Sequence, residues 1–492
     1  MKTMGFLNKK YTTQGLYLGK PEAEAENVSQ TQNLLAFFED YQNISNSIEK
    51  GCFIITGRKG AGKSAYAGWL IEKSESEDMQ YCSLIKKNEF DLETMIQSIP
   101  FEGLRFEALF EWIVLVRIVK LIIDSRIGNY LKEYRALTEF YNKNSGLVNI
   151  DRYVINEILA NKEINFSPLK KNFGFISNIL GTKSIKAPFF NMITPLRETI
   201  RKVLNMEIYA NAKFYILFDD LDVKFKLSRE KDKVMLMDLI RVARRYNTEY
   251  LKNTSAKILI FLRDDIGDRL EGVDCDKNKI FSSYEYCINW YEHNIALQDE
   301  KNIMLRKFIN KRLSVGFKEL GIPFNEEDPW LTFVAEDIKE QKSSFKYILD
   351  YTFYLPRDII TIFKNVGNKN LKLPLSHNDI NILLREYSKI KKKELVDELV
   401  AIYEKEYIDN IFSFLKELNN GWNVSYSEAL NLLEKHQLQI GDWQNLIDYC
   451  LLVPVDRNGH MFYNYREQVI SEDFEKYTFR TPKILSLYFQ QR

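Results

Sequence analysis

Histidine and cysteine are scarce in this sequence, and neither residue type is clustered. The 492 residues include 4 histidines and 5 cysteines, with no CxxC pair and no Cys/His group among them. A zinc site or a disulfide framework needs such a pattern. The scattered histidines also argue against a Ser-His-Asp or His-metal enzyme. We therefore expect any catalytic chemistry to rest on other residue types.

The sequence also lacks an excess of charge of either sign and a long apolar run. Its 69 basic and 68 acidic residues leave a formal net charge of +1, which excludes a globally basic nucleic-acid binder but not a local basic patch. The N-terminus has no apolar core of a signal peptide. The most apolar stretch, residues 112–123, is interrupted by Arg117 and Lys120 and is shorter than the ~20 residues of a membrane span. We expect a cytoplasmic protein of several domains that makes no membrane contact.

A glycine-rich motif follows the first predicted strand. Residues 52–56 (CFIIT) form an apolar, β-branched run that is typical of a buried strand, and residues 65–73 are predicted to be helical. Between them lies GRKGAGKS, which matches the phosphate-loop pattern GxxxxGK[ST] in the strand–loop–helix context that it requires. The residues expected to bind the nucleotide are Gly57, Arg58, Lys59, Gly60, Ala61, Gly62, Lys63, Ser64 and Ala65.

The residue types of this loop suit a nucleoside triphosphate bound with Mg²⁺. Glycines let backbone N–H groups turn inward around the phosphates, and the helix N-terminus adds its partial positive charge. Lys63 is expected to reach the β- and γ-phosphates, and the Ser64 hydroxyl to ligate Mg²⁺. No NKxD motif for guanine is present, so we expect ATP rather than GTP. No LSGGQ-like signature of an ABC ATPase occurs either.

A second apolar segment, residues 213–222 (KFYILFDDLD), ends in acidic residues, as a Walker B strand does. Asp219 is expected to hold the Mg²⁺, and Asp220 to polarise the attacking water. Open α/β sheets place their ligands at this edge of the strands. The next predicted strand, residues 257–262 (KILIFL), is followed by Arg263, to which we assign a γ-phosphate-sensing role. An ion pair with the neighbouring acids is the alternative for this arginine.

The segments GRKGAGKSA, ILFDDLD, ILIFLRDDI and LPRDII together resemble those of bacterial AAA+/STAND-like P-loop ATPases, in the neighbourhood of KAP-like and origin-recognition proteins. The double aspartate and the arginine after the next strand resemble STAND proteins more than standard AAA+ enzymes, which usually carry Asp-Glu and a polar amide there. The resemblance covers roughly residues 30–370. It implies an α/β P-loop NTPase core, a parallel sheet with flanking helices, followed by a helical lid. It also implies that Arg357 is a lid arginine that reaches the γ-phosphate. An ordinary residue at a helix N-terminus is the alternative, and no arginine finger is identified.

The spacing of the motifs predicts the domain organisation. The interval from Gly57 to Asp219 is several times longer than the ~30 residues of a strand–helix–strand unit, so a helical insertion is expected over about residues 89–211. Helices are predicted near residues 104–125, 127–143 and 151–162, with a loop at 167–191 and a further helix from Thr194-Pro195. The expected domains are a lead-in (1–30), the ATPase core (31–294), a helical lid (295–394) and a winged-helix domain (395–492).

The winged-helix prediction rests on helices followed by a hairpin signal. We expect helices over residues 396–418, 425–435 and 442–452, the second opening with a Ser425/Glu428 capping box. Asn458-Gly459 then separates two extended segments, which is a strong hairpin signal. The presumed recognition helix carries Asp442 and Asp448 and no cation, so an interaction module is favoured over a DNA reader.

Two functions remain open on these grounds. The first is an ATP-hydrolysing molecular switch that controls oligomerisation or a separate effector protein, and the resemblance points to bacterial antiphage defence. It implies a homo-oligomer that turns ATP into ADP and phosphate. The alternative is a DNA-binding ATPase of initiator or loader type that acts in DNA replication, repair or mobile-element transactions.

Overall fold

The computed structural model describes all of the chain except residues 1–10, 27–32, 78, 87–104, 146–162, 222–229, 269, 271–275, 293–298, 340–341, 401, 422, 464, 466–472 and 492. The chain divides into two compact units. Gln42–Ile288 forms the sheet unit, and Met1–Tyr41 together with Asn289–Arg492 forms the helical unit.

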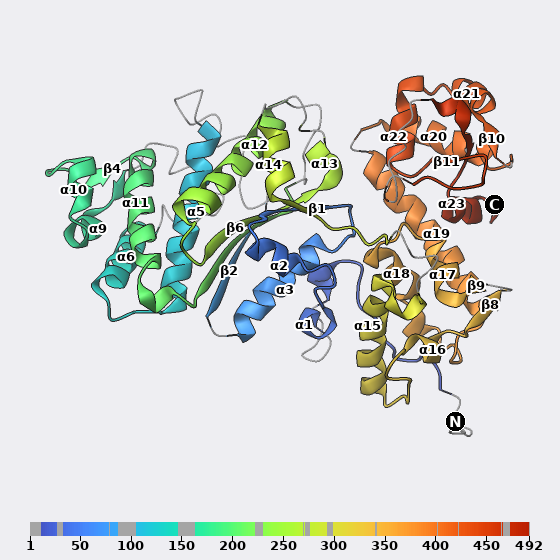
Figure 1. Ribbon diagram of the computed structural model, residues 1–492, viewed down its shortest axis with the longest axis horizontal. Coiled ribbons are helices and arrows are strands. Elements are labelled where there is room, and N and C mark those ends of the chain that lie inside the picture. The colour runs from blue at the N-terminus through green and yellow to red at the C-terminus, as the bar shows by residue number, and fades with distance from the viewer. Residues whose placement is uncertain are drawn as a thin grey trace. The chain divides into compact units, whose positions relative to one another are not determined.

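A five-stranded parallel sheet with the order β2-β5-β6-β1-β7 is the centre of the sheet unit (Figure 1). All four residues of β1 are buried, as are all of β5 except its first. Such continuous burial is typical of parallel strands covered on both faces. The strands are β1 (Ile54–Gly57), β2 (Gln80–Lys86), β5 (Lys213–Asp219), β6 (Ala256–Arg263) and β7 (Glu285–Cys287).

Helices cover both faces of this sheet. Tyr66 of α3 (Lys63–Ser76) contacts Phe261 of β6, whereas Phe110 of α5 (Arg105–Ser125) contacts Phe218 of β5. Phe218 pairs with Ile260, the residue before Phe261, and successive residues of a strand point to opposite faces. Therefore α3 and α5 lie on opposite faces. The remaining flanking helices are α2 (Ile44–Glu49), α12 (Glu230–Arg245), α13 (Asp264–Asp268) and α14 (Lys277–Tyr284).

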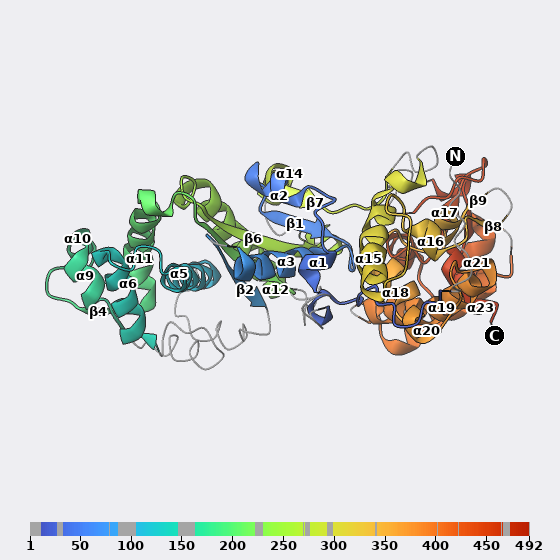
Figure 2. The ribbon, with the colours of Figure 1, turned by 90° about the horizontal axis from the view of Figure 1, so that it is seen from below.

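The helical insertion lies between β2 and β5 along the chain, as expected. Both views show its later elements gathered beyond α5 (Figure 2). The apolar run at residues 112–123 lies inside α5, where Trp112 is buried against Phe189. Among the described helices, none combines the length and apolarity that a membrane crossing would need. The elements after α5 are α6 (Lys132–Lys143), β3 (Ile164–Asn165), α9 (Ser167–Asn172), α10 (Phe175–Leu180), β4 (Lys186–Ala187) and α11 (Phe189–Leu204).

Several predicted boundaries within the insertion were wrong. The second helix begins at Lys132 rather than residue 127, because Arg126 and Gly128 have left-handed backbones that a helix cannot include. The predicted loop at 167–191 contains two short helices and β4. The next helix begins at Phe189, so Pro195 lies inside it. The helix predicted at 151–162 lies outside the described residues.

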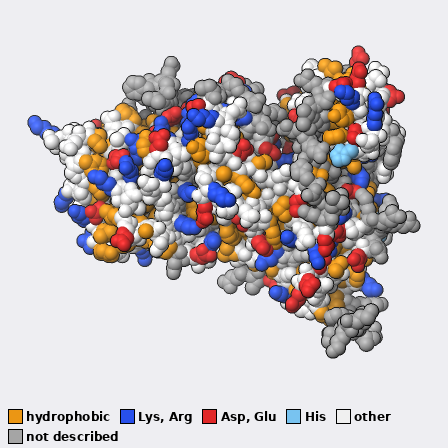
Figure 3. Space-filling model, in the orientation of Figure 1, with side chains coloured by type: hydrophobic (Ala, Val, Ile, Leu, Met, Phe, Trp, Pro, Cys, Tyr) orange, Lys and Arg blue, Asp and Glu red, His pale blue; other side chains and the backbone are white. Residues whose placement is uncertain are grey.

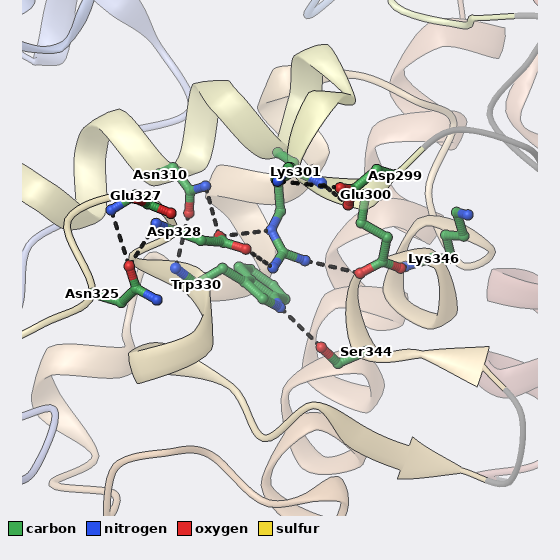
Figure 4. A network of polar contacts seen from close by, with 11 residues as sticks. Asp299, Glu300, Lys301, Asn310, Asn325, Glu327, Asp328, Trp330, Ser344 and Lys346 are labelled. Atoms are coloured by element: carbon green, nitrogen blue, oxygen red, sulfur yellow. Dashed lines mark hydrogen bonds and ion pairs between the residues drawn. The ribbon is translucent and has the colours of Figure 1, made fainter. Parts of the chain in front are cut away.

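The first half of the helical unit is a bundle in which charged side chains are buried in pairs. Arg306, only 2% exposed, bonds to Asp328 at 2.7 and 3.2 Å and to Glu300 at 3.0 Å. Asp328 also accepts a hydrogen bond from Asn310, and the Trp330 indole donates to Ser344 (Figure 4). A buried cation satisfied on several sides fixes the elements that carry its partners. The helices of this part are α15 (Met304–Leu320), α16 (Trp330–Phe333), α17 (Ser344–Leu349), α18 (Pro356–Phe363) and α19 (His377–Leu399).

The described residues of the predicted lead-in are held against this bundle. Thr13 Oγ1 donates to the Val366 carbonyl at 2.8 Å. The Glu26 carboxylate pairs with Arg312 at 2.7 Å, and both side chains are almost fully buried. These contacts make the N-terminal segment part of the helical unit.

The C-terminal part combines helices with a three-stranded antiparallel sheet of order β10-β12-β11. The capping box of Ser425 and Glu428 is confirmed. The single helix predicted at 396–418 was wrong, because the chain leaves the helix between Leu399 and Lys405. Its elements are α20 (Lys405–Leu418), β10 (Val424–Ser425), α21 (Tyr426–Lys435), α22 (Trp443–Asp448), β11 (Val453–Val455), β12 (Thr478–Arg480) and α23 (Lys483–Phe489).

The predicted turn at Asn458-Gly459 is present, although the hairpin is minimal. Gly459 has φ +80°, and the Asp456 N–H donates to the His460 carbonyl at 3.0 Å. Beyond the turn, a single bridge joins Val455 to Met461, and the strand that pairs with β11 is the more distant β12.

Candidate functional site

The glycine-rich segment lies at the carboxyl end of β1 and leads directly into α3. Gly57 and Gly62 have φ values of +154° and +104°, a region that residues with a Cβ rarely adopt. A Cβ on Gly57 would also lie 3.2 Å from Ile288 and 3.3 Å from Ala61. Both glycines are therefore required by the backbone path itself, and the loop turns at the end of the sheet where an open α/β fold binds ligands.

Lys63 opens α3 and folds back over the loop. Its ammonium group is 2.5 Å from the Gly57 carbonyl and 3.1 Å from the Arg58 carbonyl, and the residue is 9% exposed. Neutral carbonyls stabilise an ammonium less than phosphate oxygens do. The arrangement thus holds a cation inside the loop, bonded to acceptors that an anion can replace.

Ser64 and Asp219 come together although they lie far apart in the sequence. The Ser64 hydroxyl bonds to the Asp219 carboxylate, which is 4% exposed at the end of β5. Burial, aided by the adjacent Asp220, raises the pKa of Asp219 to about 6, while Ser64 and Lys63 oppose the rise. A desolvated carboxylate beside a hydroxyl is the oxygen donor set that Mg²⁺ prefers. These residues therefore fit a magnesium ion.

The set of protein groups that could hold a magnesium ion here is small. Within the described ranges, no group of three or more His, Cys, Asp or Glu residues is placed to hold a metal. Mg²⁺ is usually held by one or two protein groups, and its other positions are taken by water and substrate phosphates. A site formed by Ser64 and Asp219 is consistent with this usual coordination.

Asp220 follows the strand with a left-handed backbone, φ +54°, and its carboxylate is partly exposed. The Lys86 ammonium is 3.4 Å from it. Lys86 ends β2 and pairs in register with Asp219, so the sheet itself brings this lysine beside both aspartates. The sequence analysis missed Lys86, because only the sheet order makes β2 and β5 neighbours.

Arg263 ends β6, which lies between β5 and β1, and it pairs in register with Gly57. Its guanidinium forms two hydrogen bonds with Asp265, at 2.9 and 2.7 Å. The local ion pair named as the alternative is therefore formed. The position suits a contact with a ligand in the loop, and the sensing role stays a prediction.

Arg357 belongs to the helical unit, in the first turn of α18. Its Nε donates to the Pro21 carbonyl at 3.2 Å, which ties the N-terminal segment to α18. The lid role assigned to Arg357 stays a prediction.

A second residue missed by the sequence analysis lies at the base of the loop. Thr56, fully buried in β1, donates its hydroxyl to the Glu285 carboxylate of β7 at 2.5 Å. The bond ties the edge strand to the strand that carries the loop. No motif marked either residue.

The acidic residues of the presumed recognition helix have local partners. Asp442 is buried and accepts hydrogen bonds from the hydroxyls of Tyr403 and Tyr407, while Asp448 accepts one from Gln444. No described residue of α22 is cationic. On the face shown in Figure 3, Lys and Arg side chains are interspersed with Asp and Glu rather than gathered in one patch.

Residues 304–396 match the family described as the FunZ-associated C-terminal helical domain. The match extends from α15 to α19 and leaves the sheet unit uncovered. No curated protein matched the chain.

Proposed function

We propose that this chain binds ATP with Mg²⁺ in the loop between β1 and α3 and hydrolyses it to ADP and phosphate, as an AAA+/STAND-like P-loop ATPase. One observation carries the proposal. Three groups of the predicted motifs converge at one end of the sheet: the Lys63 ammonium inside the loop, the Ser64 hydroxyl, and the buried Asp219 carboxylate to which Ser64 bonds. A strand–loop–helix of any other function would not need that convergence.

The roles follow from the positions of the groups. Backbone N–H groups of the loop and Lys63 bind the phosphates, while Ser64 and Asp219 hold the Mg²⁺, which neutralises developing charge on the phosphates. Asp220 polarises the attacking water once its carboxylate leaves Lys86. Arg263 senses the γ-phosphate by exchanging Asp265 for a phosphate oxygen. When Asp220 and Lys86 part, both side chains are partly exposed to water, and the second exchange gives Arg263 one anionic partner in place of another.

We further propose that the nucleotide state acts as a switch on oligomerisation or on a separate effector protein. The resemblance of the motifs to STAND-like ATPases supports this, and a role in bacterial antiphage defence rests on that resemblance alone. Arg357 is the proposed lid residue. The helices α20 to α22 with the β10-β12-β11 sheet support a winged-helix module, and the absence of cations on α22 favours a protein partner over DNA.

The experiment is ATP turnover and particle size, each with and without duplex DNA. Lys63→Ala is expected to lose ATP binding, and Asp220→Asn to keep binding while losing turnover. Lys183→Ala, an exposed lysine of the insertion, is the matched control and is expected to behave as the wild type. Normal turnover in both site variants would refute the site. Turnover that rises with DNA would instead favour the initiator or loader function.

A further inference from the structure

A cavity of about 300 Å³ opens at the end of the sheet that lies opposite to the glycine-rich loop. It lies at the amino ends of β1 and β6, beside the π-helix η4 (Tyr246–Tyr250). The strands rise about 3.3 Å per residue, so the four residue-to-residue steps from Phe53 to Gly57 separate the cavity from the loop by roughly 13 Å. The volume is that of a small-molecule site. Its walls include Cys52, Phe53, Leu251, Lys252, Lys257 and Tyr284.

The charge of the cavity is positive. Lys252 and Lys257 line it, and none of its lining residues is acidic. The Glu49 carboxylate lies outside the lining, pairs with Lys213 at 3.6 Å and also acts on Lys257. Two lysines share that carboxylate, and an anion bound in the cavity would add a partner for Lys252 and Lys257.

Hydrogen-bond donors remain to hold such an anion. Lys252 is exposed at the rim and has no hydrogen bond or ion pair among the described residues, and the same is true of the Tyr284 hydroxyl. The Lys257 ammonium donates one N–H to the Ile48 carbonyl at 2.8 Å and has two further N–H groups to donate. Desolvation lowers the pKa of Lys257, which an anionic partner would reverse.

The apolar side of the cavity is aromatic. The rings of Phe53 and Tyr284 are 5.2 Å apart at an angle of 34°, with Phe53 buried and Tyr284 partly exposed. Leu251 and Ala256 extend this apolar surface. Aromatic faces bind flat, apolar bodies well.

The wall formed by η4 is built around an irregular turn. The Asn247 side chain forms two hydrogen bonds with the backbone of Ile258, one from each of its amide atoms, at 2.8 and 3.0 Å. Single π-helical turns occur frequently at functional sites. The same contact joins the cavity wall to β6, the strand that ends at Arg263.

We propose that this cavity is a second ligand site, which takes a small anion with a planar, apolar body. The anionic group binds Lys252, Lys257 and the Tyr284 hydroxyl, and the planar body lies against the Phe53–Tyr284 pair. The site is separate from the loop, and the proposal goes beyond the ATPase function. β6 runs from the cavity at its amino end to Arg263 at its carboxyl end, so a ligand bound in the cavity can influence Arg263.

Cys52 supplies a built-in probe. Cys52 is a lining residue whose thiol donates to the Glu285 carbonyl at 3.7 Å, and burial raises the pKa of this thiol, so alkylation is slow and best followed at alkaline pH. We suggest measuring iodoacetamide labelling of Cys52 in the whole protein by peptide mass spectrometry, with phenyl phosphate as the ligand probe. Phenyl phosphate is expected to slow labelling of Cys52 several-fold, while phenol and inorganic phosphate have little effect because each lacks one half of the required chemistry.

Lys252→Gln is the decisive variant, because this exposed lysine has no structural partner to lose. It is expected to weaken protection by phenyl phosphate roughly ten-fold, the scale of one charge-assisted hydrogen bond. Lys183→Gln changes another exposed lysine of the same unit and should leave protection by phenyl phosphate unchanged.

Lys63→Ala separates this site from the proposed ATP site. Protection of Cys52 by phenyl phosphate is expected to persist in that variant, since the loop lies at the other end of the strands. Protection that disappears in Lys63→Ala, that is unaffected by Lys252→Gln, or that inorganic phosphate gives as well as phenyl phosphate would each overturn the proposal. Unchanged labelling at saturating phenyl phosphate would do the same.

Discussion

Asp219→Asn is expected to make the ligand-free protein more stable at neutral pH. The pKa of Asp219 is raised from 3.8 to about 6 by burial and by Asp220. A raised pKa means that the folded state binds the proton more tightly than the unfolded state does. Stability therefore falls as pH rises from 3.8 to 6, and the whole loss is present above pH 6.

The size of the loss follows from the shift. About two pKa units correspond to about 3 kcal/mol at 1.36 kcal/mol per unit, which is an upper limit because Lys63 and Ser64 can relax toward the charge. Asparagine has nearly the same shape and still accepts the Ser64 hydrogen bond, but it carries no charge to desolvate. The variant should gain up to this amount above pH 6 and nothing below pH 4.

The assay is urea unfolding of both proteins between pH 4 and pH 8, without nucleotide or metal, followed by a probe confined to the sheet unit. The wild type should lose stability across this range relative to the variant. Mg²⁺ with ATP should stabilise only the wild type. Parallel pH profiles for the two proteins would refute the claim that Asp219 is a desolvated carboxylate.

Three further predictions rest on other contacts. Lys86→Gln is expected to raise ATP turnover by up to about five-fold, since the partly exposed ion pair with Lys86 restrains Asp220 by at most ~1 kcal/mol. Measuring phosphate release checks this prediction. A slower variant would show that Lys86 assists turnover instead. Glu26→Gln should cost the helical unit about 3 kcal/mol in urea unfolding, because it leaves Arg312 charged and buried without its partner; a loss under 0.5 kcal/mol, the scale of ordinary surface changes, would contradict this. Arg457, which directly precedes the Asn458-Gly459 turn, offers a cation at the predicted wing, and Arg457→Glu should leave duplex DNA binding and its salt dependence unchanged if the C-terminal module binds protein.

Three of the five strands of the sheet could be predicted because each contains a continuous apolar run. The run before the loop, the run ending at Asp219 and the run ending at Arg263 all became neighbours in one parallel sheet. Those runs are buried on both faces, so their pattern depends little on the rest of the chain. The capping box at Ser425 could be predicted for the same reason, because its two residues are three positions apart.

Features that depend on distant partners could not be predicted. The run of three lysines at 391–393 has the composition of a solvated surface, yet Lys391 of α19 is buried and pairs with Asp358 at 3.0 Å. The Asp358 carboxylate belongs to another helix, and no local sequence pattern predicts its pairing with Lys391. The Lys86–Asp220 pair could not be predicted for the same reason, since it depends on which strands are adjacent. Short helices such as α9 and α10 have too few turns to show a period.

The most direct test of the central claim is equilibrium binding of ATP in the presence of Mg²⁺ to the wild type and to Lys63→Ala. The Lys63 ammonium contributes charge-assisted hydrogen bonds of about 1.5–3 kcal/mol, so the variant should bind roughly 10- to 100-fold more weakly. Binding by the wild type should also weaken when Mg²⁺ is removed. A wild type that does not bind ATP, or a variant that binds it equally well, would contradict the account.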